Sequence, residues 1–186
     1  MPSVGATENA LLCACGADGV TTIYNAAREP EIVDLANMLN AMGARVSGGG
    51  SSFIEVEGVP VESLYPCEHT TVGDRIEAGT FLTGGALMGG PVTVRGIDPS
   101  YLRMALMKLE AMGCDVQAGA TVSPCGARGR SRPRPADACR TRLPHRPQAQ
   151  LMLLAAAPRG RPCITENGVR EPLHVASELM RMGADI

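Results

Sequence analysis

The sequence repeats at an interval of 70 residues, and this interval constrains the fold more than any other feature. Met-Gly-Ala at 42–44 recurs as Met-Gly-Cys at 112–114 and as Met-Gly-Ala at 182–184. Each triplet closes a similar helical pattern, and a second apolar stretch with a short β-like run lies upstream of each. The period exceeds that of common solenoid repeats. We therefore expect two or three large units that fold together about a pseudo-axis.

One unit alternates helical and strand patterns. In the first unit, apolar residues recur at helical spacing, which predicts a helix with one buried face; they are Ile32, Leu35, Ala36, Leu39 and Met42. Pro30 suits its first position, Glu31 complements its N-terminal dipole, and Gly43 supplies a left-handed stop. Residues 52–57 alternate apolar and acidic side chains, which predicts a strand. This alternation favours a layered α/β fold in which parallel strands are expected.

Composition narrows the classes of protein. Hydrophobic residues make up 45% and aromatic residues 3%, so an aliphatic core is expected. The net charge of -2 argues against a nucleic-acid partner. No apolar stretch is long enough to span a membrane, and no secretion signal is visible, which predicts a cytoplasmic location without membrane contact.

The seven cysteines predict no metal site, because no Cys-x-x-Cys pair occurs. We expect reduced, structural thiols, with Cys13, Cys15 and Cys114 in or beside apolar helical patterns as small hydrophobic residues. His69, His145 and His174 occur singly, and a solvated or core histidine is expected for the first two.

Five segments, in order, carry a family resemblance: Pro2–Leu12, Asn25–Ala44, Gly73–Phe81, Gln148–Ala156 and Glu178–Ile186. They resemble UDP-N-acetylglucosamine 1-carboxyvinyltransferase, an enolpyruvyl transferase. The likeness covers residues 2–122 well and 148–186 in part, roughly the middle of a full-length enzyme. The related 5-enolpyruvylshikimate-3-phosphate synthase transfers the same group to another acceptor, and the segment at 25–44 favours the nucleotide-sugar branch.

The resemblance implies a fold and its division. The expected architecture is an incomplete inside-out α/β barrel of βαβαββ units, three to a domain. Residues 1–72 would be the last unit of the first domain, and 73–122 the first unit of the second. Residues 148–186 would form a partial second unit, after an irregular Arg/Pro-rich segment at 123–147. Asp74 and Arg75 would lie at the domain hinge, against a plain surface salt bridge as the alternative.

The implied reaction transfers the enolpyruvyl group of phosphoenolpyruvate to UDP-N-acetylglucosamine, in peptidoglycan precursor synthesis. It requires a base, an acid and cations around phosphate, but neither metal nor organic cofactor. The family's acid is a cysteine on a loop that this chain lacks. Its base is an aspartate just before the Gln-Ala-Gln motif, where this chain has Arg146 and Pro147, and a guanidinium cannot accept a proton. No catalytic residue is retained, so the isolated chain is expected to be inactive.

Substrate contacts are implied at Ser3, Val4 and Gly5, which match positions that contact the uridine diphosphate. Free amides at a helix start accept phosphate oxygens, although an ordinary helix cap by Ser3 or Thr7 explains the same residues. Glu29 and Glu31 match glutamates of the interdomain cleft, and both also suit a helix N-terminus.

Two non-enzymatic alternatives remain. The chain could be a truncated remnant that self-associates through exposed apolar faces. Less favoured is a binding module that uses the seven arginines between 123 and 147 on polyanions. Our hypothesis for that segment is a shifted reading frame, which resequencing the DNA would test.

Overall fold

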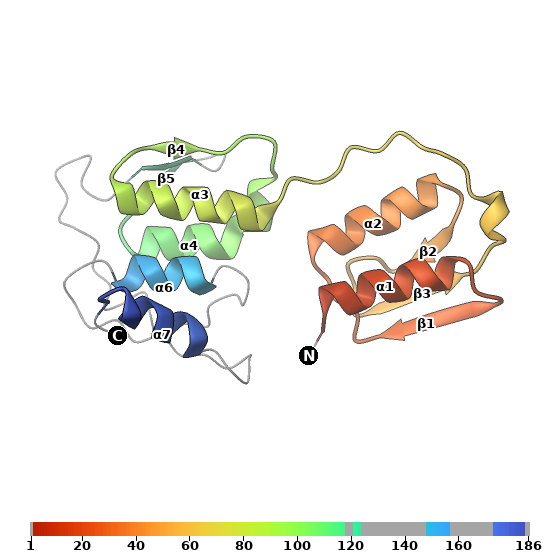
Figure 1. Cartoon of the computed structure of the whole chain (residues 1–186). Coiled ribbons are helices and arrows are strands. Elements are labelled where there is room, and N and C mark those ends of the chain that lie inside the picture. The colour runs from red at the N-terminus through yellow and green to blue at the C-terminus, as the bar shows by residue number, and fades with distance from the viewer. Residues whose placement is uncertain (1, 118–120, 124–147, 157–172, 185–186) are drawn as a thin grey trace. The chain divides into compact units, whose positions relative to one another are not determined.

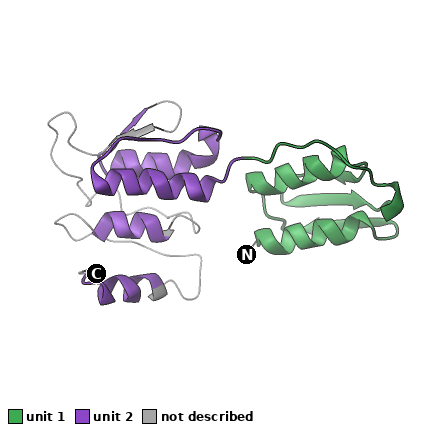
Figure 2. Cartoon of the chain, turned by 45° about the horizontal axis from the view of Figure 1, so that its top comes forward, with its two compact units in different colours: residues 1–72 green, residues 73–186 purple. Residues whose placement is uncertain are grey.

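A computed structural model describes residues 2–117, 121–123, 148–156 and 173–184. The chain divides into two compact units, Met1–Val72 and Gly73–Ile186 (Figure 2). Both combine helices with a small sheet. The coarse α/β expectation is therefore correct.

In unit 1, two helices lie on one side of a three-stranded sheet (Figure 1). Its elements in chain order are α1 (Val4–Cys15), β1 (Val20–Tyr24), α2 (Pro30–Ala41), β2 (Arg45–Ser47), β3 (Phe53–Glu57) and the 3-10 helix η1 (Val61–Ser63). On β3, the expected alternation is confirmed, because Ile54 and Val56 are fully buried while their neighbours are exposed. These two side chains face Leu11 of α1 and Ile32 of α2 in one apolar core.

The expected parallel pairing of strands is wrong for the described residues. The sheet order is β1-β3-β2, and β3 pairs antiparallel with both neighbours. Strands β1 and β2 therefore run in the same direction, as a crossover through α2 requires, but β3 lies between them. The reason is the short connection at residues 48–52, which returns the chain directly beside β2 as a hairpin. Alternation within a strand carries no information about which partner it takes.

Unit 2 repeats this order. Its elements are α3 (Arg75–Met88), β4 (Val92–Thr93), the 3-10 helix η2 (Pro99–Leu102), α4 (Arg103–Ala111), β5 (Asp115–Gln117), β6 (Thr121–Ser123), α6 (Gln148–Ala156) and α7 (Leu173–Arg181). The second sheet has the order β4-β6-β5, again antiparallel. Its core joins Leu82 of α3, Leu109 of α4 and Leu154 of α6.

The three Met-Gly triplets adopt one conformation. Gly43, Gly113 and Gly183 have φ angles of 100°, 91° and 94°. In each copy, the amide two residues after the methionine donates to the carbonyl five positions earlier, from Ala44 to Leu39, Cys114 to Leu109 and Ala184 to Leu179. This is the Schellman ending of a helix, and it needs a left-handed residue at the glycine. The 70-residue interval is therefore a repeat of structure as well as of sequence.

The cysteines differ from one another in burial. Cys15 and Cys114 are buried, as expected, and burial raises the pKa of the Cys15 thiol. Cys13 is exposed, so its assignment as a buried thiol is wrong. Residues two positions apart on a helix point roughly 200° away from each other, so Cys13 and Cys15 cannot share the buried face.

Several sequence predictions lie outside the described residues. They are the predictions for residues 124–147, including Arg146, Pro147 and His145. No helix in the described ranges is long and apolar enough to cross a membrane.

Candidate functional site

The start of α1 is tied to the loop that follows β1 through one buried side chain. The Thr7 hydroxyl donates to the Ser3 carbonyl at 2.8 Å and accepts from the Ala27 amide at 3.0 Å. Thr7 is 4% exposed, and Ala27 is fully buried. A buried amide needs a partner, so this hydroxyl fixes the loop against the first turn of α1.

The loop turns sharply as it leaves β1. Asn25 has a φ of 55°, the left-handed region that asparagine tolerates better than most residues. The next amide, of Ala26, donates to the Ser52 carbonyl at 3.1 Å, which holds the turn against the sheet. Because Ala26 and Ala27 are then buried, the chain comes back to the surface at Arg28 and Glu29.

Beside this loop lies a shallow, open cavity of about 440 Å³. It is lined by Pro2, Asn25, Arg28 and Glu29. Arg28 is an exposed cation, and the Glu29 carboxylate accepts a bond from the Arg28 amide at 2.9 Å. A cavity with an arginine beside the positive end of a helix is suited to an anionic ligand.

The predicted substrate residues begin α1 next to this cavity. Ser3 is the N-cap, and its hydroxyl accepts from the Ala6 amide at 3.4 Å, a long bond. Val4 is 8% exposed and belongs to the core, so only its backbone is available to a ligand. A Cβ built on Gly5 would meet nothing within 4 Å, so the backbone there is open. Both the helix-cap role and the ligand role are therefore compatible with this geometry.

The two predicted cleft glutamates occupy different places. Glu29 is the N-cap residue of α2 and lines the cavity, although its side chain makes no capping bond. Glu31 lies in the first turn of α2 and does not line the cavity. Pro30 is at the expected first helical position.

The predicted hinge pair begins unit 2. Asp74 is the N-cap of α3, and its carboxylate accepts from the amides of Ile76 at 2.7 Å and Glu77 at 3.2 Å. Arg75 is the first residue of α3 and has a partner of its own. Asp74 therefore has a local role, helix capping, that the sequence analysis did not assign to it.

Sequence reasoning missed Asn25, Arg28 and the long-range role of Thr7. Asn25 and Arg28 lie inside the segment that carries the resemblance, but neither has a pattern of its own. A left-handed asparagine after a predicted strand is a usable turn signal. The Thr7–Ala27 bond spans 20 residues, and no local pattern predicts it.

Among the residues that the structure describes, no group of three or more His, Cys, Asp or Glu side chains could hold a metal ion. His69 does have a carboxylate partner, Asp34, at 3.0 Å.

Comparison with known proteins identifies the family. The model of the family described as EPSP synthase (3-phosphoshikimate 1-carboxyvinyltransferase) matches residues 1–186. The chain belongs to the EPSP synthase family. Among curated members, the UDP-N-acetylglucosamine 1-carboxyvinyltransferase of Corynebacterium jeikeium is 46% identical over 99% of this chain. A protein of the same name from Symbiobacterium thermophilum is 47% identical over all of it.

A solved structure agrees with this family. The enolpyruvyl transferase NikO from Streptomyces tendae matches 95% of this chain with a TM-score of 0.75 and 27% identity. The chain spans less than half the length of these relatives, with 44% and 42% for the two curated proteins and 42% for NikO.

Proposed function

We propose that this chain is part of a UDP-N-acetylglucosamine enolpyruvyl transferase and that unit 1 carries a share of its nucleotide-sugar site. The relatives at 46% and 47% identity bear that name, which supports this acceptor over a phosphorylated shikimate. The complete enzyme would act in peptidoglycan synthesis with phosphoenolpyruvate as the donor. The cytoplasmic location stays a prediction from sequence.

The cavity beside α1 is the observation that carries the proposal. A diphosphate needs backbone amides and a cation at short range. Ser3, Val4 and Gly5 bring the first amides of α1, and Arg28 lines the same cavity as Pro2, the residue that precedes them. Because Gly5 has no neighbour at its Cβ position, a phosphate oxygen could approach the backbone closely. Glu29 would repel an anion, so its role is better suited to sugar or uracil hydroxyl and amide groups.

The domain assignment is part of the same proposal. Units 1 and 2 share an element order and an antiparallel sheet of the same topology, which supports their being repeat units of an inside-out barrel. Residues 1–72 would then complete one domain, and 73–186 would begin the other. Asp74 and Arg75 would form the hinge, and Glu29 and Glu31 would border the cleft.

Catalysis by the chain alone is not proposed. None of the seven cysteines matches the family's catalytic acid, and Arg146 with Pro147 stands where the base is expected. A transferase without its acid or base would lose the proton transfers that the addition and the elimination require. The chain is therefore proposed to bind acceptor weakly and to turn over nothing.

Ligand titration tests this proposal. Saturation-transfer NMR on the purified chain should detect UDP-N-acetylglucosamine but not shikimate 3-phosphate. Arg28→Ala should weaken nucleotide-sugar binding about tenfold, since a charged hydrogen bond to phosphate is lost. The matched control is Arg45→Ala, because Arg45 is an exposed arginine of the same unit that pairs with Glu57. Equal binding of UDP-N-acetylglucosamine and shikimate 3-phosphate, or phosphate release from phosphoenolpyruvate above background, would contradict the proposal.

A further inference from the structure

The segment that follows β3 returns along the helices of unit 1. The Gly58 amide donates to the Gly19 carbonyl and the Val59 amide to the Cys15 carbonyl, both at 2.9 Å. Val61 lies directly over Gly16, where a Cβ would come within 2.8 Å of its methyl group. The chain is thus seated on the end of α1 before it turns toward α2.

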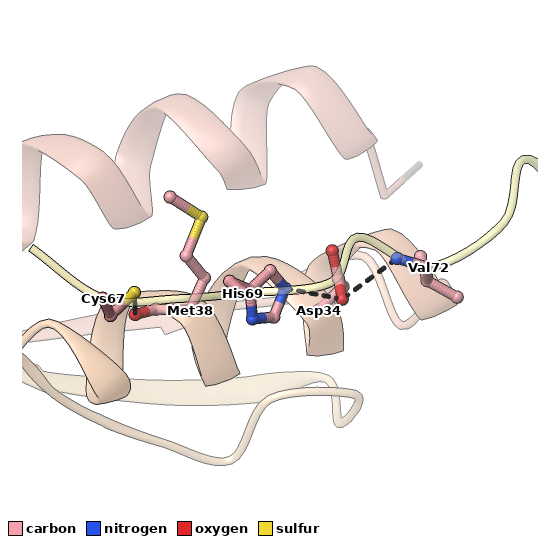
Figure 3. Close-up of polar contacts among 5 residues, drawn as sticks. All are labelled: Asp34, Met38, Cys67, His69 and Val72. Atoms are coloured by element: carbon pink, nitrogen blue, oxygen red, sulfur yellow. Dashed lines mark hydrogen bonds and ion pairs between the residues drawn. The ribbon is translucent and has the colours of Figure 1, made fainter.

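Residues 65–72, which we call the strap, then follow α2 backwards in steps. The Tyr65 amide donates to the Met42 carbonyl at 3.0 Å, and the Cys67 thiol lies 3.9 Å from the Met38 carbonyl. At the next step, Nε2 of His69 lies 3.0 Å from Oδ1 of Asp34 (Figure 3). Because a carboxylate only accepts hydrogen bonds, the ring hydrogen lies on that nitrogen.

The spacing of these contacts is physically consistent. The strap advances two residues between contacts while α2 advances four. Two residues of extended chain cover about 6.6 Å, and four residues of helix rise about 6 Å. An extended segment can therefore meet the same row of α2 repeatedly without strain. The strap therefore makes one contact with α2 at each turn of the helix.

Asp34 makes the last and strongest of these fastenings. The same Oδ1 that faces His69 also accepts from the Val72 amide at 3.3 Å. The side chains of Asp34 and His69 are both 19% exposed, so water competes little for this carboxylate. Hydrogen bonds to a charged acceptor are roughly twice as strong as those between neutral groups.

The position of Asp34 within α2 has no helical explanation. Aspartate is a poor helix former, and its charge favours a helix only in the first turn. Asp34 is four residues beyond Pro30, past that turn. Its contacts with His69 and Val72 of the strap explain why an aspartate stands at this position of α2.

We propose that the strap is a detachable fastening and that Asp34 is the positioning residue that fixes the chain at Val72, the last residue of unit 1. Unit 2 begins at the next residue, and Asp74 caps its first helix. While Asp34 holds His69 and Val72, the last residues of unit 1 stay on α2. When the Asp34 contacts break, residues 68–72, which follow the Cys67 contact, can leave α2, and extended they span about 16 Å. This inference does not depend on the proposed function.

Cleavage by a glutamate-specific protease tests whether the strap detaches from α2, because Glu68 lies inside the strap. A protease binds several residues in extended, unattached form, so an anchored strap resists it. Asp34→Ala should raise the rate of cleavage after Glu68 about tenfold or more, as expected for loss of two bonds to a charged acceptor. Asp34→Asn keeps an acceptor oxygen without the charge and should restore part of the protection. Asn37→Ala, at an exposed polar position of the same helix, is the matched control and should cleave like the native chain.

Cleavage after Glu57 in β3 reports unfolding of the whole unit. A rise at Glu68 alone supports the proposal, and equal rates in Asp34→Ala and the native chain overturn it. If Asp34→Ala raises both rates together, the variant has unfolded, and His69→Ala then decides. That change lies on the strap and leaves α2 intact. A selective rise at Glu68 in His69→Ala supports a detachable strap, whereas an unchanged rate overturns it.

Discussion

At the scale of single residues, a small number of polar side chains organise the candidate site. Thr7 is the clearest case, because one hydroxyl serves two backbone groups that are 24 residues apart in Ser3 and Ala27. A buried polar group is costly to leave without a partner, so its removal should affect the site and the stability together.

Thr7→Val preserves the shape of the side chain and removes both hydrogen bonds. The Ala27 amide would then be buried without a partner among the described residues, at a cost of about 1–3 kcal/mol in the free energy of unfolding. Urea denaturation followed by circular dichroism measures this change. Thr7→Ser, which keeps the hydroxyl, should lose about 1 kcal/mol for the missing methyl group. If the two variants are equally destabilised, the hydroxyl is not what holds the loop.

Residue identity also explains which local features were predictable. Pro30 and Gly43 stand at the ends of α2 where their backbone preferences place them. By contrast, Asp34 and His69 are 35 residues apart and Thr7 and Ala27 are 20 apart. Such pairs are made by tertiary folding, and neither propensity nor local spacing carries any sign of them.

At the scale of secondary-structure elements, the same type of helix ending occurs three times in the described residues. The three left-handed glycines end their helices with the same hydrogen bonds, yet their surroundings differ. A Cβ on Gly43 would come within 2.8 Å of the Tyr65 ring, whereas a Cβ on Gly183 would meet nothing within 4 Å. This difference separates the cost of backbone strain from the cost of a steric clash.

Gly183→Ala should therefore report strain alone, about 1–2 kcal/mol for a left-handed residue with a side chain. Gly43→Ala should cost more, because the Tyr65 ring must also move from its place at the start of the strap. Amide hydrogen exchange in the last turn of α2 and of α7 measures the two effects locally. Adding Tyr65→Ala to Gly43→Ala should remove the excess. A cost at Gly43 no greater than that at Gly183 would mean that the ring yields freely.

Strand direction shows where element-level prediction fails. The alternation at 52–57 correctly gives a strand and its buried face, Ile54 and Val56. It does not show that β3 lies between β1 and β2. The tight return at residues 48–52 explains only the antiparallel pairing of β3 with β2. Helix–strand alternation suggests parallel neighbours only while each strand is followed by a helix, and β2 is followed by β3.

At the scale of the whole chain, the family and the fold class followed from sequence, because five ordered motifs and one 70-residue period are global signals. The polar contacts that shape the cavity did not. The sequence also predicts exposed apolar faces, and large apolar side chains are exposed among the described residues. Phe81 on α3 is 60% exposed and Leu153 on the adjoining α6 is 43% exposed. Soluble monomers rarely expose large apolar patches that serve no binding function.

We therefore expect this chain to self-associate through the α3–α6 face. Sedimentation velocity should show the mean mass rising with protein concentration, because burying Phe81 and Leu153 between copies removes apolar area from water at roughly 25 cal/mol per Å². Phe81→Glu with Leu153→Glu should reduce the association, since each copy would then present a charge to the same surface. Met107→Glu is the matched control, because Met107 is 52% exposed and lies on α4 rather than on α3 or α6. A monomer at all concentrations, or equal loss of association in the control, would show that this face is not what draws the copies together.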